Sequence, residues 1–259
     1  DFIGRTIGEM NQVNNVIDVL LDNAIMNLET MCTHPVTKGG LAGKLNNFSS
    51  STETVQLKNI PRGPVETELF NHFKLIHRTH PDYIELYLGD RTGGFVSNDD
   101  STVPAGYNPT KRPWYKNGLD ADGNAAIAKA YLSTNGQYVT AVVKAYKDSN
   151  GKVEYIGGID ISLQRLTEII NNIRIGKTGF LILTENDGTV LAYPGKNEIL
   201  SKNINELGIN ELSERIKDTE GTFYFDLDGK ERMAHVIISQ KAGWKIIGVL
   251  EESEITAGA

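Results

Sequence analysis

Apolar residues recur near the start of the chain in alternating steps of four and three. A polar residue, Asn14, interrupts the line, whose apolar members are Ile3, Ile7, Met10, Ile17, Leu21, Ala24, Leu28 and Met31. This spacing places them on one face of a single helix, which we expect over residues 1–34. The helix would be roughly 45–50 Å long, more than the diameter of one small domain. It could pack in one ordinary core or run as a spine past two stacked modules, and the rest of the sequence favours a spine.

Loop, helix and strand patterns follow one another along the next part of the chain. Residues 35–63 are rich in Gly, Ser, Thr and Asn and predict a loop, and residues 64–80 predict a second amphipathic helix that ends before Pro81. Period-two patterns between turn residues then predict strands at residues 83–88, 94–97, 126–132, 137–146 and 153–161. After Asp160 the apolar period becomes helical again, up to Ile173.

A weak internal repeat predicts two modules of similar architecture. Residues 84–97 and 180–193 each follow the order strand, turn, strand. Each half later contains a hairpin signal, at Asn150-Gly151 and at Asp228-Gly229, and ends in an apolar strand that leads into a helix. We therefore expect an α+β fold, with a long N-terminal helix followed by two tandem modules built on antiparallel sheets. The predicted boundaries are 1–34 for the long helix, 35–170 and 171–253 for the two modules, and 254–259 for the start of a C-terminal helix.

Composition limits the classes of partner. The chain has 259 residues, of which 39% are hydrophobic and 23% charged, which is typical of a soluble globular protein. Its formal net charge of −7 argues against nucleic acid as a partner. The single cysteine, Cys32, excludes an internal disulfide framework. The chain starts at Asp1 without a targeting segment, and no run approaches the ~20 apolar residues that span a bilayer, so we expect an excised fragment.

Two segments carry the most informative chemistry. The first contains Tyr107, Arg112, Trp114 and Tyr115 within nine residues, and the second places Asp160 in Gly-Gly-Ile-Asp-Ile-Ser. A guanidinium pairs in a bidentate manner with a carboxylate, and an acid with aromatic faces can hold an ammonium group. These groups together predict a site for a small zwitterion. They include neither a nucleophile nor a metal-binding set, so the chemistry indicates recognition and not catalysis.

Each of these residues also has an ordinary structural interpretation. Arg112 could lie on the surface and Trp114 in the core, but their place together on an expected loop favours ligand contact. Asp160 could face solvent or cap the helix that follows Ser162. Three more residues on strands of the same module could line the pocket or pack in the core: Tyr87, Tyr131 and Ser133.

Other polar clusters favour structural roles. His77 and His80 lie close to Asp82, but no further histidine is near them in the sequence, so we expect no metal site there. Residues 120–124 resemble the start of a calcium loop, but the later positions lack its glycine and closing glutamate, which predicts a turn. Cys32 has no basic neighbour and is expected to be inert. No cofactor is expected.

A family resemblance rests on five features. These are the long helix, the strand at 84–90, the block at 112–115, the hairpin at 143–159 with Asp160 after it, and Gly-Lys-Thr-Gly-Phe at 176–180. In these features the chain resembles, over nearly its whole length, the double Cache (dCache) sensor domains. Those domains comprise two PAS-like modules on a long N-terminal helix, outside the membrane in bacterial chemoreceptors and sensor kinases.

Within that family, the spacing Tyr-x4-Arg-x-Trp-Tyr with a later Asp resembles the amino-acid-binding subgroup. The resemblance implies that Tyr107, Arg112 and Trp114 hold the carboxylate of the ligand, and that Tyr115 and Asp160 hold its amino group.

The chain departs from the subgroup at two positions. Asn108 stands where many relatives have Asp, and Ser133 stands where amino-acid-binding relatives commonly carry a second acid. A site with a single acid would suit an amine with fewer hydrogen-bond donors, such as proline or a betaine, because aromatic faces can hold it.

The resemblance implies a receptor domain and no enzyme. We expect the ligand-binding part of a transmembrane bacterial chemoreceptor, anchored in the inner or plasma membrane by flanking helices and facing the periplasm or the extracellular space. The ligand would bind in the first, membrane-distal module, the second module would be membrane-proximal, and pairing through the long helix would suit a homodimer. The alternatives are a dCache sensor for a carboxylic acid or other metabolite on a histidine kinase or cyclic-dinucleotide enzyme, a secreted hydrolase using Asp160, and a soluble solute-binding protein.

Overall fold

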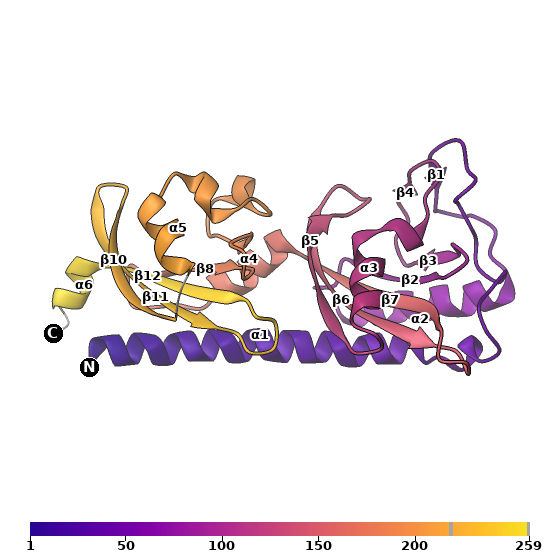
Figure 1. Ribbon diagram of the computed structural model, residues 1–259, viewed down its shortest axis with the longest axis horizontal. Coiled ribbons are helices and arrows are strands. Elements are labelled where there is room, and N and C mark those ends of the chain that lie inside the picture. The colour runs from indigo at the N-terminus through magenta and orange to yellow at the C-terminus, as the bar shows by residue number, and fades with distance from the viewer. Residues whose placement is uncertain (218–219, 258–259) are drawn as a thin grey trace. The chain divides into compact units, whose positions relative to one another are not determined.

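The computed structural model describes residues 1–217 and 220–257 and divides into two compact units. The first unit comprises Leu21–Ser162, and the second unit comprises Asp1–Leu20 together with Leu163–Ala259. The boundary expected near residue 170 therefore differs from the division after Ser162, because the helix that begins at Leu163 groups with the second unit. Figure 1 shows the chain from its indigo N-terminus to its yellow C-terminus.

The long helix predicted from the apolar line is present as α1 (Phe2–Cys32), a single helix of 31 residues. The residues on the predicted line from Met10 to Met31 are almost completely buried, whereas Asn14 and the first members, Ile3 and Ile7, are partly exposed. Residues up to Leu20 group with the second unit and those from Leu21 with the first. The three-and-four spacing therefore identifies one apolar face along α1, and this face has buried residues in both units.

The first unit is built on a five-stranded antiparallel sheet with the order β3-β2-β7-β6-β5. Its strands are β2 (Glu85–Asp90), β3 (Phe95–Ser97), β5 (Ala126–Leu132), β6 (Tyr138–Lys147) and β7 (Val153–Ser162). Around the sheet are α2 (Pro64–Thr79), α3 (Pro113–Asp120), the turns η1 (Pro35–Thr37) and η2 (Pro109–Lys111), and a small pair, β1 (Val55–Gln56) with β4 (Thr102–Val103). The helix and strands predicted for this part of the chain are confirmed to within about two residues at their ends.

The two faces of this sheet have different partners. On one face Gly157 lies against Cys32 and Leu28 of α1. On the other face the sheet carries an aromatic cluster that includes Phe95, Trp114 and Tyr107. Successive residues of a strand point to opposite faces of the sheet. Gly157 therefore lies on the face that packs against α1, and Gly158 lies on the face that carries the aromatic cluster.

The second unit repeats the same sheet order, β9-β8-β12-β11-β10. Its strands are β8 (Phe180–Thr184), β9 (Val190–Ala192), β10 (Gly221–Leu227), β11 (Lys230–Ile238) and β12 (Lys245–Glu251). Its helices are α4 (Leu163–Asn171), α5 (Asn210–Ile216), α6 (Glu252–Ala257) and the short turns η3 (Asn197–Ile199) and η4 (Ile204–Leu207). The internal repeat and the α+β fold with two antiparallel sheets are thus confirmed.

One local prediction is wrong. Trp114 and Tyr115, expected on a loop, lie in the first turn of α3, and Arg112 is the residue that precedes this helix. Pro113 occupies the first helical position, where its fixed φ and missing N–H favour a helix start. The turn predicted at residues 120–124 is confirmed, and Gly123 there has a positive φ of 92°.

A loop in the second unit is held by a carboxylate from α6. Glu254 accepts hydrogen bonds from the backbone N–H of Lys177, from the N–H of Thr178 at 2.8 Å and from the Thr178 hydroxyl. These bonds lower the pKa of Glu254, against an opposing effect of burial.

We expect Glu254→Ala to lower the free energy of unfolding by about 1–2 kcal/mol, because charge-assisted hydrogen bonds to backbone N–H groups are lost. The loss should shrink as the pH falls through the lowered pKa of this carboxyl, since the protonated group binds these donors less well. Urea unfolding at neutral and acidic pH measures both effects. Glu252→Ala, on the same helix, is the matched control and should change little; equal losses for the two variants would contradict the assignment.

Candidate ligand-binding site

A small hollow lies on the aromatic face of the first unit's sheet. Its volume is about 10 Å³, enough for roughly one water molecule. Strands β2, β3, β5 and β7 contribute to it, together with the start of α3 and the loop after β5. The lining residues are Glu85, Tyr87, Phe95, Tyr107, Arg112, Trp114, Tyr131, Ser133, Thr134 and Asp160.

Seven of the eight residues expected at the site line this hollow; Tyr115 does not. Its ring meets that of Trp114 edge-on, with centroids 5.8 Å apart. Burial and the nearby charge of Asp90 raise its pKa. Tyr115 therefore belongs to the packing beside the hollow.

The sequence interpretation missed a second acid, Glu85. Glu85 on β2 lies directly opposite Asp160 on β7, and both side chains line the hollow. They are only 5% and 1% exposed. Position 133 carries a serine and no acid, but the expectation of a single-acid site is wrong, because a different strand supplies the second carboxyl. The alternation of side chains along β2 could have indicated this, since Glu85 is two positions before Tyr87.

The two acids are held by hydroxyl groups. The hydroxyls of Tyr87 and Tyr131 donate to Oδ1 of Asp160 at 2.6 and 2.8 Å, and Ser97 donates to Oε1 of Glu85 at 2.7 Å. Burial raises the pKa of both carboxyls, and repulsion by Asp160 raises that of Glu85 further. The hydrogen bonds and Arg112 act in the opposite direction. Burial also raises the pKa of Tyr87 and Tyr131, which keeps them protonated as donors.

A glycine and a β-bulge determine where the side chains of Tyr87 and Tyr131 point. A Cβ atom at Gly158 would lie 2.5 Å from the ring of Tyr87, so this ring can cross the strand only because residue 158 has no side chain. Between Ala128 and Tyr131 the register of β5 shifts against β6. Because side chains alternate along a strand, the extra residue turns Tyr131 to the same face as Ala128.

Arg112 lies at the edge of the hollow with most of its donors available. Its Nη2 donates to the backbone carbonyl of Leu132 at 3.0 Å, and its guanidinium carbon is 5.8 Å from the ring centroid of Tyr131. Its buried Nε has no hydrogen-bond partner within the part of the chain that the structure describes. A guanidinium carries five N–H donors, so Arg112 can donate two parallel hydrogen bonds to a carboxylate.

Aromatic rings close the rest of the hollow. The centroids of Tyr87 and Trp114 are 4.7 Å apart and those of Phe95 and Tyr107 are 4.9 Å apart, both pairs edge-on. The side chain of Trp114 lies beside that of Tyr107 and partly offsets the rise in the pKa of Tyr107 that burial causes. Gly89 makes room for this wall, because a Cβ there would lie 2.9 Å from the ring of Trp114.

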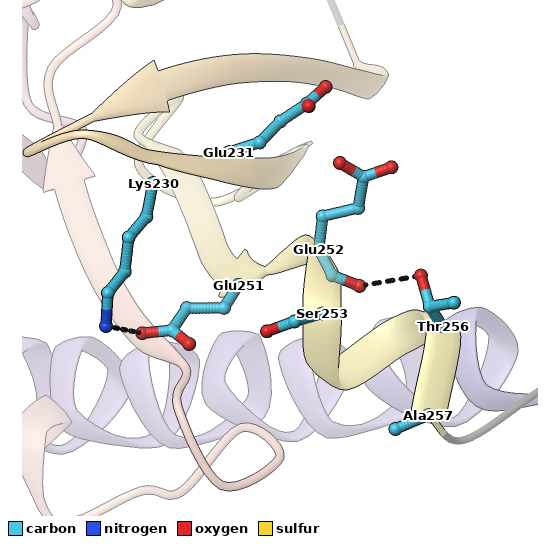
Figure 2. A pocket seen from close by; sticks show the side chains of 7 residues that line it. All are labelled: Lys230, Glu231, Glu251, Glu252, Ser253, Thr256 and Ala257. Atoms are coloured by element: carbon cyan, nitrogen blue, oxygen red, sulfur yellow. Dashed lines mark hydrogen bonds and ion pairs between the residues drawn. The ribbon is translucent and has the colours of Figure 1, made fainter.

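A second, open hollow lies in the second unit, beside α6 (Figure 2). Lys230 pairs with Glu251 at 3.1 Å, and the repulsion and hydrogen bonding of Glu252 raise the pKa of Glu231. Glu231 and Lys230 are exposed, so water solvates these charges. This surface therefore lacks the enclosed, opposed charges of the first unit.

Over residues 1–217 and 220–257, no three His, Cys, Asp or Glu side chains gather in a metal-binding group, and this includes the region of His77 and His80. Among the helices within those same ranges, none combines the length and the apolar character that a bilayer crossing requires.

The long helix with two similar antiparallel modules is the architecture of a sensor domain. The sequence model of the Cache domain matches residues 7–259, and the chain belongs to this family. A probable methyl-accepting chemotaxis protein from Bacillus thuringiensis is 32% identical over 190 residues, covering 73% of this chain and 28% of the relative. The methyl-accepting chemotaxis protein TlpB from Bacillus subtilis is 26% identical, over 91% of this chain and 34% of the relative. The chain thus spans about a third of the length of the curated relatives it matches.

Solved structures share the fold. The ligand-binding domain of the Pseudomonas fluorescens chemoreceptor CtaA, in complex with L-alanine, has a TM-score of 0.73 and 21% identity, covering 98% of this chain and 99% of the other. That of the Pseudomonas aeruginosa amino-acid chemoreceptor PctB, in complex with L-Arg, has a TM-score of 0.71 and 20% identity, covering 97% of this chain and 96% of the other.

Proposed function

We propose that this chain is the extracytoplasmic ligand-binding domain of a membrane-anchored methyl-accepting chemotaxis receptor, and that the hollow in the first unit binds a free amino acid. The observation that carries the proposal is the arrangement of Arg112 and the buried acids Glu85 and Asp160 around one small hollow. Curated relatives that are methyl-accepting chemotaxis proteins, and similarly folded chemoreceptor domains solved with amino acids, support it.

The ligand would bind by its two charged ends. Arg112 would take the carboxylate, next to the Tyr107–Trp114 pair, and Asp160 and Glu85 would take the ammonium group. Tyr115 has no contact with the amino group in this proposal, because its side chain does not line the hollow. A hollow of about 10 Å³ must widen to admit an amino acid. The bond from Arg112 to Leu132 is at the surface, so breaking it to open the site costs little.

Two carboxyl groups change the expected class of amine. A site with a single acid suits proline or a betaine, whereas a site with two acids suits an ammonium group, which has three N–H donors to share between Asp160 and Glu85. We therefore propose that amines with several N–H donors bind best. A ligand without them would leave a buried acid unpaired, at a cost of about 1–3 kcal/mol or more.

A thermal-shift screen of amino acids, betaines and plain carboxylic acids tests the proposal. A ligand at 100 times its dissociation constant stabilises the folded state by about 2.7 kcal/mol, which such a screen detects readily. We expect amino acids to stabilise the protein.

Asp160→Asn is expected to remove the stabilisation by amino acids, because the hollow loses a carboxylate that pairs with the ammonium group. The same thermal-shift measurement on the variant tests this. Stabilisation of the wild type by plain acids alone, retained in Asp160→Asn, would replace the amino acid with a carboxylic acid as ligand.

Homodimer formation and the identity of the output module also remain proposals. On α1, Val16, Val19 and Met26 are 39%, 58% and 60% exposed, which would suit pairing of two copies through this helix. A histidine kinase is the alternative output, because the extracellular domain of a putative histidine kinase also shares the fold, with a TM-score of 0.69.

A further inference from the structure

We propose that Glu85 and Asp160 share one proton in the ligand-free protein, and that the ammonium group of the ligand takes the place of this proton. Binding would then release a proton and depend on pH. This inference rests on the proposed function for the identity of the ligand, but its first half concerns the free protein alone.

The geometry places the two carboxyl groups in the same small hollow. Glu85 and Asp160 are direct partners on neighbouring antiparallel strands. Side chains at such positions have Cβ atoms about 4.5–5.5 Å apart. Both line the same small hollow and both are at least nine-tenths buried. Two carboxylates that share a buried site repel each other, so one of them keeps a proton.

The groups around the pair do not supply enough positive charge to ionise both acids. Tyr87 on β2, Tyr107 before η2 and Tyr131 on β5 stay neutral because burial raises their pKa values. Asp99, after β3, adds a further repulsive charge at Glu85.

Arg112 at the start of α3 favours the ionised form of both acids. One guanidinium can balance one of two carboxylates, which leaves the second for a proton or for a cation from the ligand.

An ammonium group is a suitable replacement for the shared proton. It brings one positive charge and several N–H donors, and it would stand between two carboxyl groups that then both act as acceptors. The carboxylate of the ligand would pair with Arg112. Glu85 and Asp160 would then depend on the ammonium group of the ligand for a nearby positive charge. A quaternary amine brings the charge without donors and fits this arrangement poorly.

The sign of the pH effect follows from the raised pKa values. Where the pair holds its proton, binding must expel it, so affinity falls by up to tenfold for each unit that the pH decreases. At higher pH the pair is already ionised and no proton is released. The free protein should behave in the opposite way. The folded state keeps a proton that the unfolded state loses, so this contribution to stability is complete below the ordinary pKa and is lost as the pH rises through the raised one.

Infrared spectroscopy of the free protein tests the shared proton without a ligand. At about pH 6, above the ordinary pKa of carboxyl groups, the wild type should show the carbonyl stretch of a protonated carboxylic acid. Glu85→Gln/Asp160→Asn, which removes both acids, should show a weaker band, because burial alone raises the pKa of Asp160 and a single replacement would leave it protonated. Asp99→Asn, which removes a nearby acid outside the pair, should keep it. A wild type without this band would overturn the inference.

Isothermal titration with L-alanine in two buffers of different ionisation enthalpy tests the exchange. At about pH 6 we expect about one proton released per ligand, falling towards zero by about pH 9. Glu85→Gln should release fewer protons than the wild type, because it keeps only the proton of Asp160, and Asp99→Asn should resemble the wild type. Binding without proton release would refute the exchange while leaving the proposed function intact. No binding of L-alanine or of any amino acid in the screen, with the infrared band present, would refute the proposed function and leave the shared proton.

Discussion

Arg112→Ala is expected to weaken the binding of an amino acid on the order of 30- to 3,000-fold. The guanidinium is the cation that faces the buried acids Glu85 and Asp160 across the hollow. Removing one partner of an enclosed, hydrogen-bonded charge pair costs about 2–5 kcal/mol, which gives this range of affinities. Isothermal titration of the wild type and the variant with the best ligand of the screen provides the measurement.

The free protein should lose less. Among the described residues Arg112 donates to the carbonyl of Leu132 at the surface, and its charge also favours the ionised form of the buried Glu85 and Asp160, so its loss should lower the free energy of unfolding by about 1–3 kcal/mol. Arg112→Lys keeps the charge but not the bidentate fork, and its affinity should be intermediate. Arg91→Ala, which removes an exposed pair with Asp148 in the same unit, is the control and should bind normally. Retention of affinity within threefold by Arg112→Ala would remove Arg112 from the site.

Gly158→Ala is expected to lower both stability and ligand affinity. The new methyl group would lie 2.5 Å from the ring of Tyr87, which must move. Overpacking of this kind costs about 1–3 kcal/mol of folding free energy. The displaced Tyr87 would no longer donate its 2.6 Å hydrogen bond to Asp160, so we expect affinity to fall on the order of tenfold. Urea unfolding and isothermal titration measure the two effects.

Gly157→Ala is the matched control, since it adds the same methyl group to the other face of the strand. There the methyl would collide with the Sγ atom of Cys32 on α1. We expect a loss of stability with little change in affinity, and the double variant Gly157→Ala/Cys32→Ala should recover part of the stability. If Gly157→Ala and Gly158→Ala reduce affinity equally, the loss with Gly158→Ala does not act through Tyr87.

This pair of glycines also indicates how a ligand signal could reach α1. Gly158 faces Tyr87 in the hollow, and Gly157 contacts Cys32 and Leu28 of the helix. Next to this contact, Glu29 of α1 accepts hydrogen bonds from Lys144 and, at 2.8 Å, from Tyr146. A shift of β7 on binding would therefore act directly on the helix. We expect structures with and without ligand to differ in the position of α1 relative to the sheet of the first unit, and identical positions would contradict this route.

Local patterns were sufficient for most of the fold. The three-and-four spacing of apolar residues determined α1, because burial of one face requires that period. Turn residues at Asn150-Gly151 and Asp228-Gly229 determined two hairpins, since few other residues adopt the positive φ required. The spacing of Tyr107, Arg112 and Trp114, with Asp160 later, identified groups that the structure does bring together.

Only the tertiary structure decided which side chains share the hollow. Glu85 and Asp160 are far apart in sequence and meet because β2 pairs with β7, and pairing between strands is a non-local choice that no local pattern contains. The shift of register in β5 decided the face of Tyr131, and the start of a helix at Pro113 directed Trp114, but not Tyr115, into the site. The sequence by itself thus determined the elements and the kinds of charge available. The number of acids that face Arg112 depends on strand register, which is fixed only when the whole sheet is packed.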